Sequence, residues 1–520
     1  MKTNFLETLQ KGYTFSGDTL VLGGAMFENE TQTGSLVQLP LRTLNRHGLI
    51  AGATGTGKTK TLQMMAEQLS LLGISSLVMD IKGDLSGVAM PGTTSPRLEE
   101  RQQKIGLPVT LAGSPVEFLS LSDQPGVRLR ATVTEFGPVL FSRILDLSEV
   151  QTGVVSVVFK YADDHKLPLL DLEDFKKTLQ YMTNEGREEA EKAYGQIASS
   201  SVGTILRKVL ALEQQGAATF FGEPSFEVRD LCRVNDQGLG YVSVLRLNDI
   251  QDKPGLFSTF MMSLLAEIYS TFPERGDADR PELMLFIDEA HLIFANASDE
   301  LLDQIESIIK LIRSKGVGIF FITQTPTDIP EAVLGQLGLK VQHALRAFTA
   351  KDRQGIKLAV QNFPETSFYD LESLITEMGI GEALVTGLNE KGIPTPLVHT
   401  MMRGPQSRMD ILTDEEIAAI NNRSAMVKKY NQAVERDSAL EILSAKIEEA
   451  QEEAHQAELK AQQEKARETS SRGGGRREKT VIEQIAANPM ARQIGRTVAR
   501  ELTRGLLGVL GIGGGSRKRR

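Results

Sequence analysis

The sequence predicts an α/β protein: a mostly parallel sheet, with a helical insertion and a long C-terminal helical extension. In residues 46–84 and 236–405, short continuous apolar segments alternate with helical segments, as expected for a sheet covered on both faces. In the first of these stretches, an apolar strand at 48–51 leads through a glycine loop into a helix and a second strand at 74–80. Strand, helix and strand in this order form the unit of a parallel sheet.

The remaining core elements follow the same alternation. Expected strands lie at 241–247, 283–287, 317–323, 340–346 and 382–386, and expected helices at 58–72, 256–271 and 300–315. Before the core, residues 1–45 contain alternating residues and glycines that predict short strands and turns. Residues 85–235 interrupt the core with amphipathic stretches at 148–163, 172–184 and 201–214, and we expect a mostly helical insertion there.

Two further segments follow the core. Thr413-Asp-Glu-Glu416 is a capping box that opens the charged region 406–470, where residues 440–468 predict a solvated helix or coiled coil. Residues 471–520 combine a glycine-rich linker with a basic tail, in which we expect a helix over 480–510.

Composition places the chain among ordinary globular proteins. It has 520 residues, of which 41% are hydrophobic and 24% are charged. No apolar run is long enough for a transmembrane segment, and the N-terminus has no signal-peptide core. The single cysteine, Cys232, excludes an internal disulfide. These features together predict a cytoplasmic protein.

Charge is unevenly distributed along the chain. The segment 472–520 carries twelve Lys and Arg against three Asp and Glu, whereas the whole chain has a formal net charge of −9. The first 471 residues are therefore acidic, and any contact with a polyanion is expected to be local.

A phosphate-binding motif occupies Gly52-Ala53-Thr54-Gly55-Thr56-Gly57-Lys58-Thr59. It matches G-x-x-x-x-G-K-[ST] in full, between a strand and a helix, as a P-loop requires. Glycines let several backbone N–H groups face one phosphate, and Lys60 continues the first helical turn at the same anion. Lys58 is predicted to reach the β- and γ-phosphates of ATP, and Thr59 to bind Mg²⁺.

An acidic pair, Asp288-Glu289, ends the apolar strand at 283–287. Open α/β sheets bind ligands at the carboxyl ends of their strands, so the pair is expected at the phosphate loop. Asp288 is predicted to hold Mg²⁺, and Glu289 to act as the general base that polarises the attacking water. The neighbouring His291 is more simply explained as a packing or hydrogen-bonding residue.

Other polar residues end strands at the same edge. Gln324 follows the strand 317–323 and could sense the γ-phosphate. The turn Asp80–Asp84 is explained equally well as a ligand-facing site and as an Asx-type turn. Arg313 and Arg346 are candidates for an arginine finger, although a surface ion pair is the simpler explanation for each.

These motifs, in this order, resemble the HerA-like branch of the FtsK–HerA superfamily of ATPases, and more closely its bacterial YjgR type. The resemblance covers residues 35–400 and includes Asn45-Arg-His47, the turn Asp80–Asp84 and Thr323-Gln324. It implies a RecA-like fold, a homo-oligomer such as a hexameric ring with ATP at subunit interfaces, and action on double-stranded DNA. It also implies that Gln324 is a sensor and that Arg313 and Arg346 lie near a neighbour's ATP.

The tail admits several interpretations. Arg492, Arg496, Arg500 and Arg504 recur every four residues, and apolar residues line the opposite helix face. Such a helix can dock on the acidic body, or bind nucleic acid, a membrane surface or a protein partner. Three functions therefore remain: a DNA motor, an ATPase acting on protein partners, and a nucleotide-gated scaffold. The intact Lys58, Asp288 and Glu289 disfavour the scaffold.

Overall fold

The computed structural model describes residues 1–471 except 277, 295–298, 433, 435 and 436. The chain divides into two compact units, Met1–Ala445 and Lys446–Arg520, and each is considered by itself. In the described part of the chain, no helix combines the length and apolar character needed to cross a bilayer. The basic tail lies outside the described residues.

The first unit contains one sheet of twelve strands. Their bounds are β1 (Thr19–Phe27), β2 (Glu30–Pro40), β3 (Gly48–Ala51), β4 (Ser75–Asp80), β5 (Val116–Ser120), β6 (Val127–Arg128), β7 (Val242–Arg246), β8 (Leu283–Ile287), β9 (Val317–Thr323), β10 (Leu339–His343), β11 (Glu382–Thr386) and β12 (Val398–Met402). In space they follow the order β2-β1-β12-β11-β10-β3-β9-β8-β4-β7-β5-β6. The strands from β10 to β6 are parallel, and the other four pair antiparallel at one edge.

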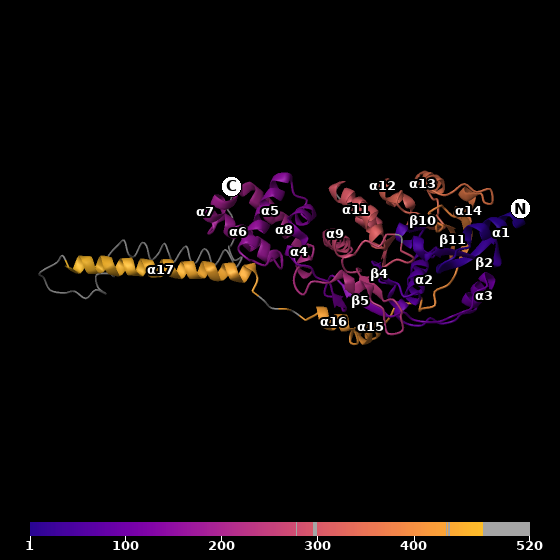
Figure 1. Cartoon of the computed structure of the whole chain (residues 1–520), viewed down its shortest axis with the longest axis horizontal. Helices are drawn as coiled ribbons and strands as arrows, with labels where there is room; N and C mark the ends of the chain where they lie inside the picture. The colour runs from indigo at the N-terminus through magenta and orange to yellow at the C-terminus, as the bar shows by residue number, and fades with distance from the viewer. Residues whose placement is uncertain (277, 295–298, 433, 435–436, 472–520) are drawn as a thin grey trace, which may run out of the picture. The chain divides into compact units, whose positions relative to one another are not determined.

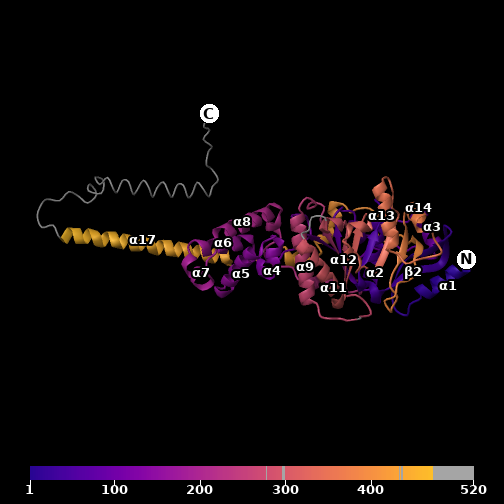
Figure 2. The same cartoon turned by 90° about the horizontal axis from the view of Figure 1, so that it is seen from above.

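Helices alternate with the strands along the chain, and most of them are labelled in Figure 1. Their bounds are α1 (Lys2–Tyr13), α2 (Lys58–Leu71), α3 (Pro96–Ile105), α4 (Val133–Ile144), α5 (Glu149–Asp164), α6 (Leu172–Thr183), α7 (Arg187–Tyr194), α8 (Ser199–Gln214), α9 (Pro254–Thr271), α10 (His291–Phe294), α11 (Asp299–Ile312), α12 (Glu331–Leu334), α13 (Ala350–Gln361), α14 (Leu371–Glu377), α15 (Asp414–Asn421), α16 (Ala425–Tyr430) and α17 (Ala439–Ser471). Helices α4 to α8 gather in one group, as seen from above in Figure 2. The predicted α/β class and mostly parallel sheet are confirmed.

Two parts of the chain differ from the expectation. Residues 1–45 were expected to hold strands and turns, but they begin with α1, whose Phe5, Leu9 and Tyr13 are buried. Residues 85–235 are mostly helical as expected, with α3 to α8, but they also contain β5 and β6, which extend the core sheet beyond β7. Both segments therefore contribute strands to the sheet: residues 1–45 contain β1 and β2, and residues 85–235 contain β5 and β6.

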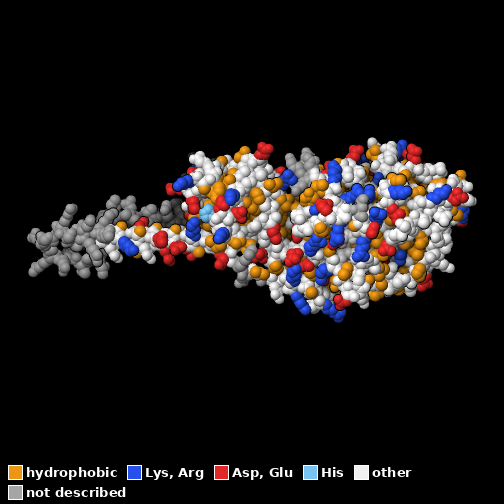
Figure 3. All heavy atoms as spheres, in the orientation of Figure 1, with side chains coloured by type: hydrophobic (Ala, Val, Ile, Leu, Met, Phe, Trp, Pro, Cys, Tyr) orange, Lys and Arg blue, Asp and Glu red, His pale blue; other side chains and the backbone are white. Residues whose placement is uncertain are grey.

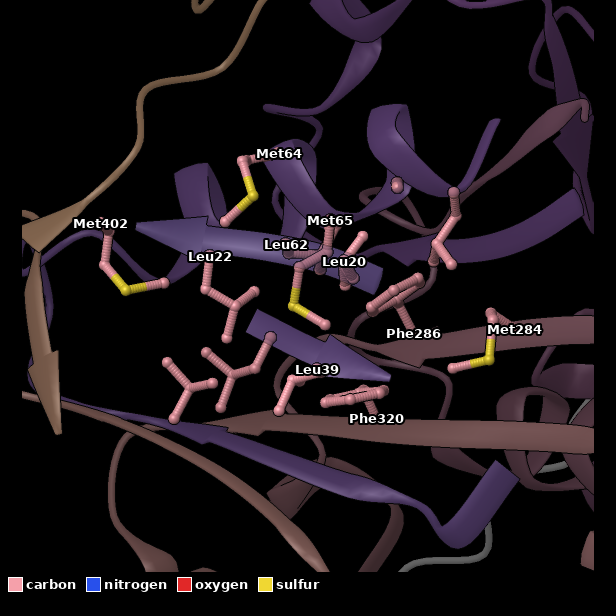
Figure 4. Packing of buried hydrophobic residues seen from close by; sticks show 14 of the residues in the cluster. Leu20, Leu22, Leu39, Leu62, Met64, Met65, Met284, Phe286, Phe320 and Met402 are labelled. Carbon is pink, nitrogen blue, oxygen red and sulfur yellow. The ribbon is translucent and has the colours of Figure 1, made fainter. Parts of the chain in front are cut away.

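The main core lies between α2 and the strands (Figure 4). Leu62 and Met65 of α2 belong to the same buried cluster as Phe286 of β8 and Phe320 of β9. The two rings are stacked with their centroids 5.6 Å apart. Burying apolar surface stabilises the folded chain by about 25 cal/mol per Å². This packing therefore holds α2 on the sheet, and with it the loop that precedes α2.

The two edges of the sheet differ. At one edge, β2 is contacted by α1 and α3, and its pairing with β1 is interrupted by register shifts at Val21/Gly23 and Gly24/Met26. At the other edge, β6 has only two residues.

Thr413 caps α15 through the predicted capping box. In α17, the described side chains beyond Ile447 are exposed as far as residue 463, as expected for a solvated helix.

Candidate functional site

The loop Gly52–Gly57 leaves β3 and enters α2 at Lys58. Gly52 has φ 154°, and a Cβ there would lie 2.5 Å from Cβ of His343, so no larger residue fits. The N–H of Gly52 donates to the carbonyl of Thr323 at 3.3 Å, and that of Ala53 to the carbonyl of Ala344 at 2.8 Å. Neighbouring strands β9 and β10 therefore hold the loop from both sides.

The start of α2 offers backbone donors. Thr61 is the first residue of this helix whose N–H reaches back to a carbonyl, that of Gly57 at 2.9 Å. The N–H groups of Lys58, Thr59 and Lys60 come before it, so they have no intrahelical partner, and the helix dipole adds positive potential there. Thr54 and Gly55 are exposed. The loop is thus open to solvent and suited to a phosphate.

Lys58 lies inside the loop. Its side chain is buried, and Nζ donates to the carbonyls of Gly52 at 2.6 Å and Ala53 at 3.2 Å. Burial lowers the pKa of Lys58, and the nearby charge of Lys82 lowers it further. A bound phosphate would place negative charge directly against this ammonium, whose hydrogen-bond partners are both carbonyls. The Lys60 ammonium instead donates to the carbonyl of Met409 at 2.6 Å.

The acidic pair follows β8. Asp288 is 3% exposed, and its Oδ2 is a buried oxygen without a hydrogen-bond partner. Burial raises the pKa of Asp288 to about 6. Glu289 adopts φ 45°, which is strained for a residue with a Cβ, and the N–H of Ala290 fixes the turn by donating to Ile322 at 2.9 Å. A cation is the natural partner of the free Asp288 oxygen.

The loop and the acidic pair meet in space. Only β9 separates β3 from β8, and all three strands are parallel, so their carboxyl ends share one edge. Both carboxylates lie near enough to Lys58 for their charges to raise its pKa, and Lys58 in turn lowers that of Glu289. Residues some 230 positions apart in the sequence thus form one site.

The site also contains Lys82, to which the sequence analysis gave no role. Its ammonium forms an ion pair with Oε1 of Glu289. Although burial on its own would raise the pKa of Glu289, this hydrogen bond lowers it. His291 lies on the other side, with Nδ1 3.2 Å from Oε2 of Glu289. Glu289 is therefore held as a carboxylate by Lys82, with the His291 ring beside its other oxygen.

Lys82 is placed by the turn Asp80–Asp84, in which it lies. Oδ1 of Asp80 accepts hydrogen bonds from the N–H groups of Gly83 at 2.7 Å and Asp84 at 3.2 Å, and Oδ2 accepts one from Leu85 at 3.1 Å. Asp80 is thus a turn-stabilising residue, as the Asx-type alternative required. The signal for Lys82 was present in the sequence, because the turn was expected at the ligand edge.

Comparisons with known proteins agree with this geometry. The profile of the family described as "Helicase HerA-like C-terminal" matches residues 26–519. The chain belongs to this family. It is therefore a P-loop ATPase of the HerA-like type.

Individual relatives are distant. The DNA double-strand break repair helicase HerA of Sulfolobus acidocaldarius is 21% identical over 388 residues, which cover 73% of this chain and 70% of that protein. A probable helicase of Methanocaldococcus jannaschii is 30% identical over 162 residues, which cover 30% of this chain and 29% of that protein. Among solved structures, the bacterial conjugative coupling protein TrwBdeltaN70, in a trigonal form with sulphate, has a TM-score of 0.50 and 13% identity. That alignment covers 78% of this chain and 95% of the other, and shows a shared fold.

The residues of this HerA-like site can hold a magnesium ion. The described residues contain no cluster of three or more His, Cys, Asp and Glu side chains suited to a metal. Mg²⁺ does not need one, because it commonly binds one or two protein oxygens together with phosphates and water. Thr59 and the free oxygen of Asp288 fit that pattern.

The predicted sensor and fingers are placed differently. Gln324 is exposed directly after β9, between the loop and the acidic pair. Arg346 follows β10 at the same edge, but its guanidinium donates to the carbonyls of Thr376 at 2.6 Å, Leu345 at 3.3 Å and Met378 at 3.4 Å. Arg313 precedes β9, so it lies at the amino ends of the parallel strands, whereas the site lies at their carboxyl ends. Arg313 therefore does not join the site of its own chain.

His343 is a second residue that the sequence analysis did not single out. It is fully buried beneath the loop, where Nε2 is 2.9 Å from Oγ1 of Thr61 and Nδ1 is 2.8 Å from the carbonyl of Glu382. Burial lowers its pKa to about 4, so the ring is neutral at physiological pH. A buried histidine in an apolar strand gives no sequence signal that separates it from a packing residue.

Proposed function

We propose that this chain is a Mg²⁺-dependent ATPase that assembles into a ring and moves or remodels double-stranded DNA. The observation that carries the proposal is the unpartnered Asp288 oxygen beside Glu289, within electrostatic reach of Lys58. The DNA part rests on family membership, since the Sulfolobus relative is named as a DNA repair helicase.

Each residue would have one task. Lys58 and the amides of the loop would hold the β- and γ-phosphates, and Thr59 with Asp288 would hold Mg²⁺, which neutralises phosphate charge when bound. Glu289 would accept a proton from the attacking water, and Gln324 would contact the γ-phosphate from the next strand. Lys82 and His291 would keep Glu289 in place.

The ring is the less direct part of the proposal. Arg346 lies at the correct edge of the sheet and Arg313 at the opposite one, so Arg313 could reach an ATP only on a neighbouring copy. Images of the protein with a non-hydrolysable ATP analogue test this. A monomer at all concentrations would exclude fingers supplied by a neighbour.

An ATPase acting on protein partners is the second candidate. The first 471 residues are acidic, and Figure 3 shows Lys and Arg interspersed with Asp and Glu on the face displayed, without a continuous basic stripe. The exposed α17 is suited to a helical partner.

The ATPase rate with and without duplex DNA separates the two candidates. Because phosphate contacts release counterions, stimulation by DNA should be strongest at low salt and fall as salt rises. Single-stranded DNA of equal nucleotide concentration is the control. An ATPase rate that duplex DNA leaves unchanged at every salt concentration would exclude the DNA motor and favour a protein partner. The proposed cytoplasmic location suits either candidate.

A further inference from the structure

One buried histidine lies directly beneath both ends of the phosphate loop. His343 is the last residue of β10, and its side chain is fully buried. A Cβ added to Gly52 would lie 2.5 Å from Cβ of His343, and one added to Gly57 would lie 3.5 Å from Cε1 of its imidazole. These are the first and the last glycine of the loop motif. The histidine therefore forms the floor on which the loop rests.

The hydrogen bonds of the His343 imidazole have a fixed direction. Nδ1 is 2.8 Å from the carbonyl oxygen of Glu382, and because a carbonyl can only accept, Nδ1 carries the proton. Burial, with a smaller contribution from the charge of Lys58, lowers the pKa of His343 to about 4, so the imidazole is neutral at physiological pH. Nε2 is then an acceptor, and the hydroxyl of Thr61, 2.9 Å away, is its donor.

Both partners of the imidazole are tied to the loop by the backbone. Thr61 of α2 is 3% exposed, and its N–H donates to the carbonyl of Gly57 at 2.9 Å. Glu382 opens β11, and the N–H of the residue before it, Gly381, donates to the carbonyl of Thr56 at 2.9 Å. The histidine therefore closes a cycle of contacts around the last residues of the loop.

Support from beneath the loop affects how tightly the loop can bind a phosphate. Backbone N–H groups form an anion site only while several of them point at the same place. A loop that must be ordered during binding binds more weakly, because the ordering costs part of the binding free energy. An imidazole nitrogen without its donor would also be buried and unsatisfied, which disfavours the present arrangement.

We propose that His343 is a positioning residue of the ATP site, which holds the phosphate loop in its binding shape by accepting from Thr61 and donating to Glu382. Both imidazole nitrogens are engaged in this way, so His343 acts through the loop and not on a phosphate. The proposal rests on the proposed function and adds a residue that prepares the loop for ATP. A purely structural role, in which the histidine stabilises the sheet alone, is the competing explanation.

The test separates ATP affinity from stability. Calorimetry with MgATP and thermal unfolding are applied to the full chain and to His343→Asn, whose amide lies near the position of Nδ1 but cannot reach Thr61. We expect ATP to bind about tenfold more weakly to this variant. The matched control is His47→Asn, because His47 is also buried and engages both nitrogens, with Ile309 and Ile319, but lies at the amino end of β3. It should lower Tm and leave ATP affinity within twofold.

Thr61 offers variants that change less of the core. Thr61→Val has nearly the same shape but no hydroxyl, whereas Thr61→Ser keeps the hydroxyl. We expect Thr61→Val to weaken ATP binding as much as His343→Asn does, and Thr61→Ser to bind ATP within twofold of the wild type. The double variant Thr61→Val/His343→Asn should lose no more affinity than either single variant, since both remove the same contact.

The opposite results would overturn the proposal. A lowered Tm with unchanged ATP affinity in His343→Asn would leave His343 with a structural role only. Additive losses in the double variant would show that the two residues do not act through one contact. Should His343→Asn fail to fold, equal ATP affinities of Thr61→Val and the wild type would overturn the proposal in the same way. A wild type that binds no ATP would instead refute the proposed function itself.

Discussion

Glu289 combines three features that a structural carboxylate does not need. It is buried, its backbone is in the left-handed region, and it is paired with Lys82. Strained backbone persists only where surrounding contacts enforce it, and such strain is concentrated at functional sites. The proposed role of general base would account for all three features.

Replacing Glu289 with Gln should stop turnover but leave ATP binding intact. The amide keeps the size of the side chain but cannot accept the proton, so kcat should fall at least ~100-fold. Steady-state kinetics and ATP calorimetry check this. Glu274→Gln is the control, because Glu274 is an exposed ion-pair partner of Lys315. A Glu289→Gln enzyme with the parental rate would refute the role.

Lys82 is expected to position Glu289 rather than to bind ATP. Lys82→Met should lower kcat about tenfold while ATP affinity changes less than twofold, because the carboxylate loses its partner but the loop does not. Lys82→Arg should restore most of the rate. A loss of ATP affinity in Lys82→Met would instead place Lys82 on the phosphates.

At the scale of elements, the pattern of apolar residues predicted most strands of the core sheet. It did not predict α1 or which strands pair with one another. Strands β3, β4, β7, β8 and β9 were visible as continuous apolar runs, which parallel buried strands require. By contrast, α1 was missed although Phe5, Leu9 and Tyr13 are spaced four apart. The pairing of β5 with β7 could not be inferred, since a short strand in a helical region does not reveal its neighbour.

Helix α1 should contribute to stability through Phe5. Phe5 is 2% exposed and stacks on Phe27 with ring centroids 5.0 Å apart. Phe5→Ala should lower the free energy of unfolding by about 3–5 kcal/mol. Phe348→Ala, at a position 87% exposed, should change it by less than about 0.5 kcal/mol. Urea unfolding of both variants checks the difference, and similar values would show that α1 is not part of the core.

Helix α9 should make stability depend on pH through Glu267. Burial raises its pKa to about 7, and nearby Glu135 and Glu227 act in the same direction, against the hydrogen bond from the N–H of Val228. The folded state therefore holds its proton more tightly than the unfolded state. Stability from this group is full below pH 4.5 and is lost as pH rises through 7. Glu267→Gln should remove this dependence, so its Tm should gain on that of the wild type between pH 5 and 8. A constant Tm difference across that range would contradict the assignment.

At the scale of the whole molecule, every described site residue lies within Met1–Ala445. The motifs predicted this site because parallel strands bring distant residues to one edge. They placed Lys82 in a turn at the ligand edge but could not predict its contact with Glu289, nor the contact of His343 with Thr61, because both depend on side-chain positions. The division of the chain into an insertion and a core remains a proposal.

Truncation after Ala445 should therefore leave ATP affinity within twofold of the full chain, since the phosphate loop and its supporting strands are retained. Calorimetry with ATP measures this, and Lys58→Ala in the truncated chain should abolish binding. Loss of binding on truncation alone would show that the site needs residues beyond 445. Any stimulation by DNA that disappears on truncation would assign DNA contact to those residues.

The margins of the sheet restrict how copies can meet. A strand at the edge of a sheet has unpaired backbone N–H and C=O groups, and a strand of another chain can hydrogen-bond to them. Such pairing leads to uncontrolled aggregation. Here β6 is too short to serve as a template, and β2 is irregular and flanked by α1 and α3. Copies that assemble must then recognise one another through side chains, which allows subunits to separate and rejoin as a continuous backbone ladder would not.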